Sequence, residues 1–204
     1  MVAAIETQPH SRIADVLAAE PTTGFAAGKD DQSENDTDGI LHIRPTNLLP
    51  NGELNLSKGK YVPPPLNAAE YLQRGEVLFN NTNSEAWVGK ACLFDTEGKY
   101  VCSNHITRLT VDTTKISAEF LVATLNMLQA KGYFGVLSTN FNNQAGINTN
   151  TLKNAIIPVP SLAVQQELVA KIDAARARRA ELLRQADEEL ANIDVYVSEI
   201  IGIE

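Results

Sequence analysis

The sequence predicts an α+β fold, in which a mixed α/β domain of residues 11–160 is followed by one long C-terminal helix of residues 161–204. Short apolar runs separated by Gly, Pro and Asn turns predict strands in the first part, and residues 118–132 have helical spacing. From residue 161 onward there is no proline, the only glycine is Gly202, and apolar residues recur at steps of three, four or seven. Residues 1–10 have no periodic pattern and are predicted to form a loose N-terminus.

The first elements of the domain are a short helical segment, a polar loop and a strand. Ile13, Val16 and Leu17 have helix-like spacing. Asp30–Asp38 is almost wholly polar and is typical of an exposed loop, with a metal-binding run as the alternative. Ile40–Ile43 alternates as a half-buried strand does.

Turn-forming residues separate the elements that are predicted between residues 50 and 79. Pro50–Glu53 contains Asn-Gly, which accepts the positive φ angles of a tight turn. Pro63–Pro65 predicts an extended connector. Glu76–Phe79 follows a glycine and predicts a short apolar strand.

A hairpin is predicted from Ala91–Phe94 and Tyr100–Cys102, joined by Asp95–Lys99. The joining segment has the acid and lysine types of some nuclease sites, but Asp, Gly and Lys are ordinary in a turn, so we interpret it as structural. Cys92 and Cys102 are symmetric about this turn, which predicts that they face each other across the hairpin, as buried thiols rather than a bridge.

The C-terminal helix is predicted from about Leu162 to Ile200, with Ser161 as its cap. It would be about 55 Å long, longer than the preceding domain, so its apolar stripe needs cover from outside that domain, most simply from another helix. Arg179 lies on this stripe, either as a snorkelling side chain or as a paired charge that sets register. The predicted stripe is Leu168, Ile172, Ala175, Arg179, Leu182, Ala186, Leu190, Ile193, Val197 and Ile200.

Composition excludes several classes of protein. No apolar run is long enough to span a bilayer, and the N-terminus lacks the basic and apolar regions of a secretion signal, so we expect a cytoplasmic protein. Two cysteines and three scattered histidines predict neither a disulfide scaffold nor a metal site. A glycine-rich phosphate loop, a nucleophile elbow and a zinc-protease helix are all absent from the sequence, so we expect no catalysis.

The net charge of −8 argues against a nucleic-acid partner until it is divided along the chain. Residues 1–39 carry 2 basic and 8 acidic side chains, residues 40–160 carry 10 and 8, and residues 161–204 carry 5 and 9. The middle is therefore mildly basic, and a DNA reader of this charge would need a more basic partner.

Amide and hydroxyl side chains gather in Asn80–Ser84 and Asn140–Gln144. Asn and Gln can bond the donor and acceptor on one edge of adenine, although Asn-rich segments also form turns and caps.

These segments, taken in order, resemble the target recognition domains of type I restriction-modification specificity subunits. The last match looks like the Pro-x-Pro-x-Leu-x-x-Gln-x-x-Ile-Val element that opens the long helix of that family. The matching segments are Gly75–Ser84, Trp87–Lys90, Ser103–Ile106 with Arg108, Gln144–Asn148 with Leu152, and Ile157–Val169.

The resemblance implies a chain without enzymatic activity that reads one half of a bipartite double-stranded DNA target. It also implies docking to the methyltransferase subunit and the restriction motor subunit, with S-adenosylmethionine, ATP and magnesium held by those partners. The first candidates for DNA contact are Asn80, Asn81, Thr82, Asn83 and Ser84, and the secondary candidates are Lys90, His105, Arg108 and Asn142. If these residues hold the scaffold instead, the reading would fall to variable loops such as Asp30–Asp38 or Lys58–Pro65.

A usual specificity subunit has two recognition domains and two helical regions, whereas this sequence has one of each. We therefore hypothesise a half-subunit that pairs its long helix antiparallel with a second copy and reads an interrupted palindrome. The rival explanation is a truncated gene product or an expressed fragment. A second functional hypothesis is a scaffold or antirestriction mimic that binds methyltransferase subunits without reading DNA.

Overall fold

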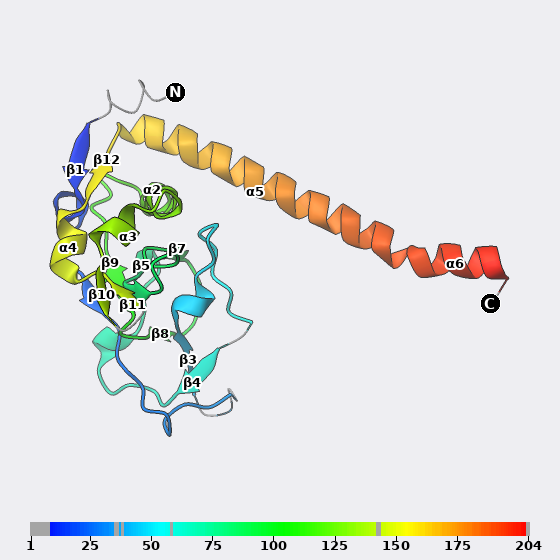
Figure 1. Cartoon of the computed structure of the whole chain (residues 1–204), viewed down its shortest axis with the longest axis horizontal. Coiled ribbons are helices and arrows are strands. Elements are labelled where there is room, and N and C mark those ends of the chain that lie inside the picture. The colour runs from blue at the N-terminus through cyan, green and yellow to red at the C-terminus, as the bar shows by residue number, and fades with distance from the viewer. Residues whose placement is uncertain (1–8, 35–36, 38, 58, 142–143, 203–204) are drawn as a thin grey trace. The chain divides into compact units, whose positions relative to one another are not determined.

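The computed structural model describes residues 9–34, 37, 39–57, 59–141 and 144–202. The chain divides into two compact units, Met1–Gln165 and Gln166–Glu204, and each is described by itself (Figure 1). The first contains short strands and helices and the second is helical, which confirms the predicted fold class.

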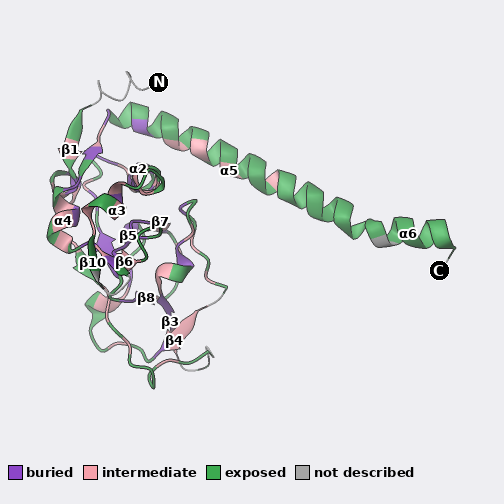
Figure 2. Ribbon diagram, viewed as in Figure 1, coloured by how far each residue is buried: buried purple, intermediate pink, exposed green. Residues whose placement is uncertain are grey.

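The core of the first unit is a four-stranded sheet in the order β2-β9-β5-β7. Strand β5 lies at its centre, is antiparallel to both neighbours, and is buried at all five residues (Figure 2). Its Val-Leu-Phe run suits a strand that is covered on both faces, which confirms the predicted strand. The bounds are β2 Thr22–Thr23, β5 Glu76–Asn80, β7 Ala91–Phe94 and β9 Ile106–Leu109.

A second sheet, in the order β4-β3-β8, corrects the predicted hairpin. Strand β3 confirms the strand predicted at residues 40–43, and β8 is parallel to it, with Cys102 opposite Ile43. Strand β7 pairs with β5 instead of β8, so the segment between β7 and β8 is a crossover from one sheet to the other. The predicted hairpin was wrong because the same apolar alternation suits any neighbouring strand. The bounds are β3 Ile40–Ile43, β4 Lys60–Val62 and β8 Val101–Cys102.

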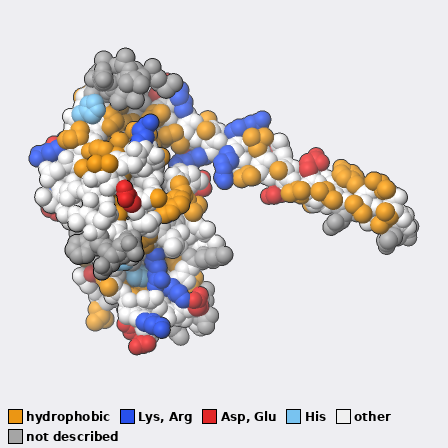
Figure 3. All heavy atoms as spheres, viewed as in Figure 1, with side chains coloured by type: hydrophobic (Ala, Val, Ile, Leu, Met, Phe, Trp, Pro, Cys, Tyr) orange, Lys and Arg blue, Asp and Glu red, His pale blue; other side chains and the backbone are white. Residues whose placement is uncertain are grey.

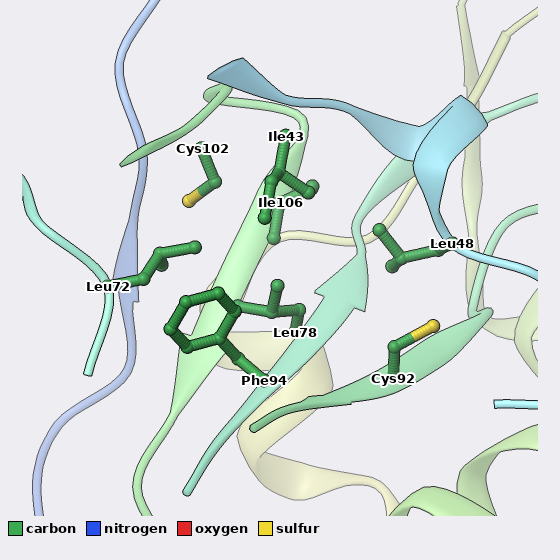
Figure 4. Close-up of a cluster of buried hydrophobic side chains, with 8 residues drawn as sticks. All are labelled: Ile43, Leu48, Leu72, Leu78, Cys92, Phe94, Cys102 and Ile106. Carbon is green, nitrogen blue, oxygen red and sulfur yellow. The ribbon is translucent and has the colours of Figure 1, made fainter. Parts of the chain in front are cut away.

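The two cysteines lie apart in one hydrophobic cluster rather than opposite each other (Figure 4). Both are buried and neither forms a disulfide, which confirms two buried thiols. Burial raises the pKa of Cys102 to about 12, so this thiol is protonated at neutral pH. The cluster consists of Ile43, Leu48, Leu72, Leu78, Cys92, Phe94, Cys102 and Ile106.

Helix α2, Ala118–Ala130, begins at Ser117, whose hydroxyl accepts a hydrogen bond from Phe120 N, and it confirms the predicted helix. Its Asn126 side chain accepts from Ala91 N at 3.0 Å and donates to Ala91 O at 2.7 Å. The Asn126 amide therefore satisfies the backbone N–H and C=O of Ala91 in β7, which lies at the edge of the central sheet.

Short elements complete the first unit. Three 3₁₀ helices are η1 Ile13–Val16, η2 Pro45–Asn47 and η3 Ala68–Glu70, and two short α-helices are α3 Tyr133–Leu137 and α4 Thr149–Asn154. Strands β10 Thr139–Phe141, β11 Gln144–Gly146 and β6 Thr82–Asn83 form a sheet in that order, and β1 His10–Arg12 pairs with β12 Ile156–Pro158. Strand β1 thus begins inside the segment predicted as a loose terminus, whereas residues 1–8 lie outside the described residues.

Helix α5, Leu162–Ala191, begins in the last residues of the first unit and makes up most of the second unit. The second unit also contains helix α6, Ile193–Ile201, and the two helices meet at Asn192. Helix α5 has 30 residues and is therefore about 45 Å long. Both helices are exposed along almost their whole length, and Figure 3 shows hydrophobic side chains along them. The predicted long helix is confirmed, with an interruption at Asn192 that the sequence pattern did not predict.

Candidate nucleic-acid interface

The two asparagines at the end of β5 lie inside the fold. Asn80 is fully buried, and its Nδ2 donates to Trp87 O at 2.9 Å, which holds the turn that follows. The Asn81 Nδ2 donates to Asn104 O at 3.1 Å and to Thr107 Oγ1 at 3.0 Å. The Asn81 carbonyl accepts from Ile147 N at 2.8 Å. Asn81 therefore ties together three separate segments, which is a scaffold role.

Two of the predicted cationic contacts are also buried. The Lys90 Nζ donates to Leu48 O at 2.6 Å and to Pro45 O at 3.1 Å, and burial lowers the pKa of this lysine. Arg108 is 8% exposed and forms an ion pair with Glu76 at 2.8 Å. These cations are compensated within the protein, and neither side chain is placed to reach a phosphate.

Arg108 also satisfies backbone carbonyl groups. Its Nη1 donates to Ala69 O at 2.7 Å and its Nη2 donates to Tyr71 O at 2.9 Å. The guanidinium therefore joins β9, β5 and the segment around η3 through one planar fork.

The remaining candidates are at least partly exposed. Thr82 and Asn83 are half-buried, and Ser84 and His105 are exposed. The Thr82 Oγ1 donates to Asn81 Oδ1 at 2.8 Å, and the Asn83 Oδ1 accepts from Ser84 N at 2.8 Å. Asn142 lies outside the described residues.

A groove of about 640 Å³ lies beside these residues. It runs between the β10-β11-β6 sheet and the β2–β9 edge of the central sheet, and the start of α4 closes one part of it. All ten lining residues are uncharged, and eight of them carry a hydroxyl or an amide. They are Thr23, Asn81, Thr82, Thr107, Thr139, Gln144, Gly146, Ile147, Asn148 and Thr149.

The register of the strands explains which side chains face the groove. Thr139 lies opposite Gly146, and Gly146 lies opposite Thr82, so these three residues share one face of the three-stranded sheet. Gln144 is two residues from Gly146 on the same strand and therefore shares that face. On the other sheet Thr23 lies opposite Thr107. The groove thus presents hydroxyl and amide groups from two sheets.

A second hollow, of about 400 Å³, is lined by five residues of the predicted polar loop and by residues of the segment Tyr61–Pro63. The five loop residues are Asp30, Asp31, Gln32, Ser33 and Thr37. The loop is attached on its N-terminal side by Phe25, which stacks on His42 at 5.1 Å between ring centroids. Residues 35, 36, 38 and 58 of the two predicted variable loops lie outside the described residues.

Sequence reasoning did not single out Gln165, which is fully buried at the start of α5. Its Oε1 accepts from Ser117 N at 2.9 Å, and its Nε2 donates to Lys115 O at 2.9 Å and Pro160 O at 2.8 Å. The signal was present in the sequence, because Gln165 is the glutamine of the Pro-x-Pro-x-Leu-x-x-Gln element.

Comparison with known proteins identifies the family to which this chain belongs. The model of the type I restriction modification DNA specificity domain matches residues 11–192, which is most of the chain. The chain belongs to this family. A curated member from Methanocaldococcus jannaschii, named as the MjaX specificity subunit of a type I restriction enzyme, is 29% identical over 99 residues. That match covers 48% of this chain and 23% of the relative.

Solved structures of the specificity-domain family share the fold. A chain from a study of complex assembly and conformational transition of the type I R-M system has a TM-score of 0.65 at 16% identity, over 98% of this chain and 49% of that one. The S subunit from M. genitalium has a TM-score of 0.63 at 13% identity, over 97% and 46%. The HsdS subunit from Thermoanaerobacter tengcongensis has a TM-score of 0.60 at 18% identity, over 95% and 44%. This specificity-domain chain therefore spans about half the length of these structures.

The described residues contain neither a helix that could cross a membrane nor a cluster of metal-ligating side chains. None of the described helices is both long and apolar enough for a membrane crossing. Within the same residues, no three or more His, Cys, Asp and Glu side chains gather as a metal site would require. The metal-binding alternative for the polar loop has no support in its described part.

Proposed function

We propose that this chain is a DNA-sequence reader that recognises one half of a bipartite target and has no catalytic role of its own. The observation that carries the proposal is the uncharged groove, in which hydroxyl and amide groups from two sheets face one hollow. Such groups bond base edges and specify sequence, whereas cations mainly bind phosphates. Family membership supports DNA as the partner.

Within this proposal the predicted contact residues divide into two groups. Thr82, Asn83, Ser84 and His105 are at least partly exposed and remain candidates for DNA contact, and Thr82 is the one of these four that lines the groove. Asn80, Asn81, Lys90 and Arg108 support the groove from inside, where their side-chain N–H groups already donate to protein partners. The buried Asn80 Oδ1 has no hydrogen-bond partner among the described residues.

The long helix is proposed as the surface that pairs with a second copy and docks a methyltransferase subunit. Leu168, Leu182 and Leu190 on the predicted stripe are exposed by 41%, 47% and 63%. An exposed stripe of this length is typical of a helix that is covered on assembly. Arg179 is exposed on that stripe and has no ion-pair partner in the described part of the chain, so it is placed to pair across a helix interface.

The distribution of charge along the chain suits a protein whose DNA binding depends on a partner subunit. Residues 161–204 carry 5 basic and 9 acidic side chains, which suits a basic docking surface. With Lys90 and Arg108 used inside the fold, eight basic side chains remain in residues 40–160, which equals the number of acidic ones there, so the mild basic excess of this region is gone. We expect weak DNA binding by the chain alone and tight binding with a methyltransferase subunit.

A DNA-shift assay with a methyltransferase subunit of a type I system tests the reading function. A target selected from random duplexes should bind the complex tightly and bind this chain alone weakly. Strong sequence-specific binding by the isolated chain would contradict the need for a partner. Capture of the methyltransferase subunit without any DNA preference would favour a non-reading scaffold or an antirestriction mimic, which the total charge of −8 also suits.

Size-exclusion chromatography with light scattering tests the pairing of helices. We expect a dimer at micromolar concentration, and we expect Leu182→Asp to give a monomer because it places a charge in the apolar stripe. Ala180→Asp introduces the same charge on the opposite side of the helix and should leave the dimer intact. A wild-type monomer, or equal behaviour of the two variants, would count against helix pairing.

A further inference from the structure

The residues that line the groove have a restricted chemistry. Guanine is read most often by Arg or Lys, and cytosine is read by Asp or Glu. None of these four residue types is among the ten lining residues. Adenine is read by the amide of Asn or Gln, and thymine by apolar contact with its methyl group. The groove therefore has the groups that suit an A·T pair.

One amide in the groove is available for a ligand. The Asn81 amide is committed to Asn104 and Thr107, and the Asn148 Oδ1 accepts from Thr151 N at 2.8 Å as the cap of α4. Gln144 is exposed, and its side-chain amide has no hydrogen-bond partner among the residues that the structure describes.

The position of Gln144 suits contact with a base edge. It begins β11, the middle strand of the β10-β11-β6 sheet, at a residue that pairs with β10 and lies beyond the two residues that pair with β6. At this end the sheet is therefore a two-stranded ribbon, which fits the major groove of B-form DNA. By register its side chain shares a face with Thr139 and Thr82, whose methyl groups can contact a thymine methyl group. Asn140, on the adjoining strand, lies opposite the buried Ala145 and belongs to the other face.

We infer that Gln144 is a specificity-determining residue, which bonds N6 and N7 of one adenine in the major groove of each half-site. The groove threonines contact the thymine of the same pair. This inference rests on the proposed reading function and adds the base pair that the groove selects and the residue that selects it.

The test is selection of random DNA duplexes by the complex of the chain with a methyltransferase subunit. The variants are wild type, Gln144→Ala, Gln144→Glu and the control Asn140→Asp. The control places the same added charge on the same ribbon but on its other face, so it reports any general repulsion from phosphates. Because Gln144 is exposed and has no described partner, all four proteins should unfold at the same temperature.

We expect wild type to select an A·T pair at the Gln144-dependent position of each half-site. Gln144→Ala should lower discrimination at that position about 5- to 150-fold and leave the other positions unchanged. Gln144→Glu should replace adenine with cytosine there, because a carboxylate accepts a hydrogen bond from cytosine N4. Asn140→Asp should select the wild-type motif.

Three results would overturn the inference. The first is a wild-type motif retained by both Gln144 variants, and the second is a Gln144-dependent position that is a G·C pair. Both leave the reading function intact. The third is failure of wild type to select any motif, which would overturn the proposed function together with this inference.

Discussion

Replacement of Arg108 by methionine distinguishes a scaffold role from a phosphate contact. The change removes a guanidinium that pairs with the buried Glu76 at 2.8 Å and donates to the carbonyls of Ala69 and Tyr71. Removal of one partner from a buried ion pair typically costs about 3–5 kcal/mol, because the other charge stays buried and uncompensated. Single domains have a free energy of unfolding of about 5–15 kcal/mol, so Arg108→Met should lose a large part of it.

The double variant Glu76→Leu with Arg108→Met tests whether the unpaired Glu76 carboxylate causes the loss of stability that we expect of Arg108→Met. It removes the uncompensated carboxylate, and apolar replacement of a buried pair is often close to neutral. The carbonyl groups of Ala69 and Tyr71 still lose their hydrogen-bond donor, which costs about 1–3 kcal/mol for each one that water does not reach. We therefore expect the double variant to be more stable than Arg108→Met and no more stable than wild type.

Urea unfolding followed by tryptophan fluorescence measures these differences, because Trp87 is the only tryptophan and lies in the first unit. Arg108→Met could instead unfold at the same urea concentration as wild type and bind DNA more weakly, with less dependence on salt. That result would show that Arg108 contacts phosphate, and it would refute the scaffold argument. A double variant as unstable as the single variant would show that the buried Glu76 carboxylate is not the cause.

Three further predictions concern stability and use the same urea assay. Gln165→Ala should lower the free energy of unfolding by about 1–3 kcal/mol, because the backbone groups that its amide bonds lose their partners; an unchanged midpoint would contradict this. Burial lowers the pKa of His42 in the folded protein, so the unfolded state binds more protons near pH 6.5. The free energy of unfolding should therefore fall as the pH falls through 6.5. His42→Gln should remove this part of the pH dependence. Gly89→Ala should cost more than Gly75→Ala: both glycines have positive φ, but only the former would place its Cβ 2.3 Å from a ring carbon of Phe134. Equal costs would show that the ring moves aside freely.

The elements that could be predicted from the sequence are those set by local patterns. The strands at residues 40–43 and 76–79 follow from short apolar runs, and α2 and the long helix follow from helical spacing. The choice of neighbour for each strand is not local. Strand β7 pairs with β5, whereas β8 pairs with β3 in parallel, and nothing in the alternation of either strand distinguishes these partners from a hairpin.

The candidate site shows the same limit at the level of single side chains. The two amide-rich segments that the sequence singles out both border the groove, because Asn81, Thr82 and Gln144 line it. Sequence reasoning could not separate inward from outward side chains. Lys90 is buried against a carbonyl 42 residues earlier, and Arg108 pairs with an acid 32 residues earlier. Such partners become visible only when the sheets are assembled.

This division between inward and outward polar groups has a consequence for how one fold can read different DNA targets. A change at Lys90 or Arg108 leaves buried carbonyls or a carboxylate without a partner, so it costs stability whatever the DNA sequence. A change at Gln144 removes no described contact within the protein, so its cost falls on recognition alone. Specificity can therefore change at the groove surface while the residues beneath it keep the fold, provided that the two sets do not overlap. The two sets meet at Asn81, Thr82 and Thr107, which line the groove and also bond one another: the Thr82 hydroxyl donates to Asn81 Oδ1, and Asn81 Nδ2 donates to Thr107 Oγ1. Substitution of Thr82 should therefore alter both target preference and stability, whereas substitution of Gln144 should alter preference only.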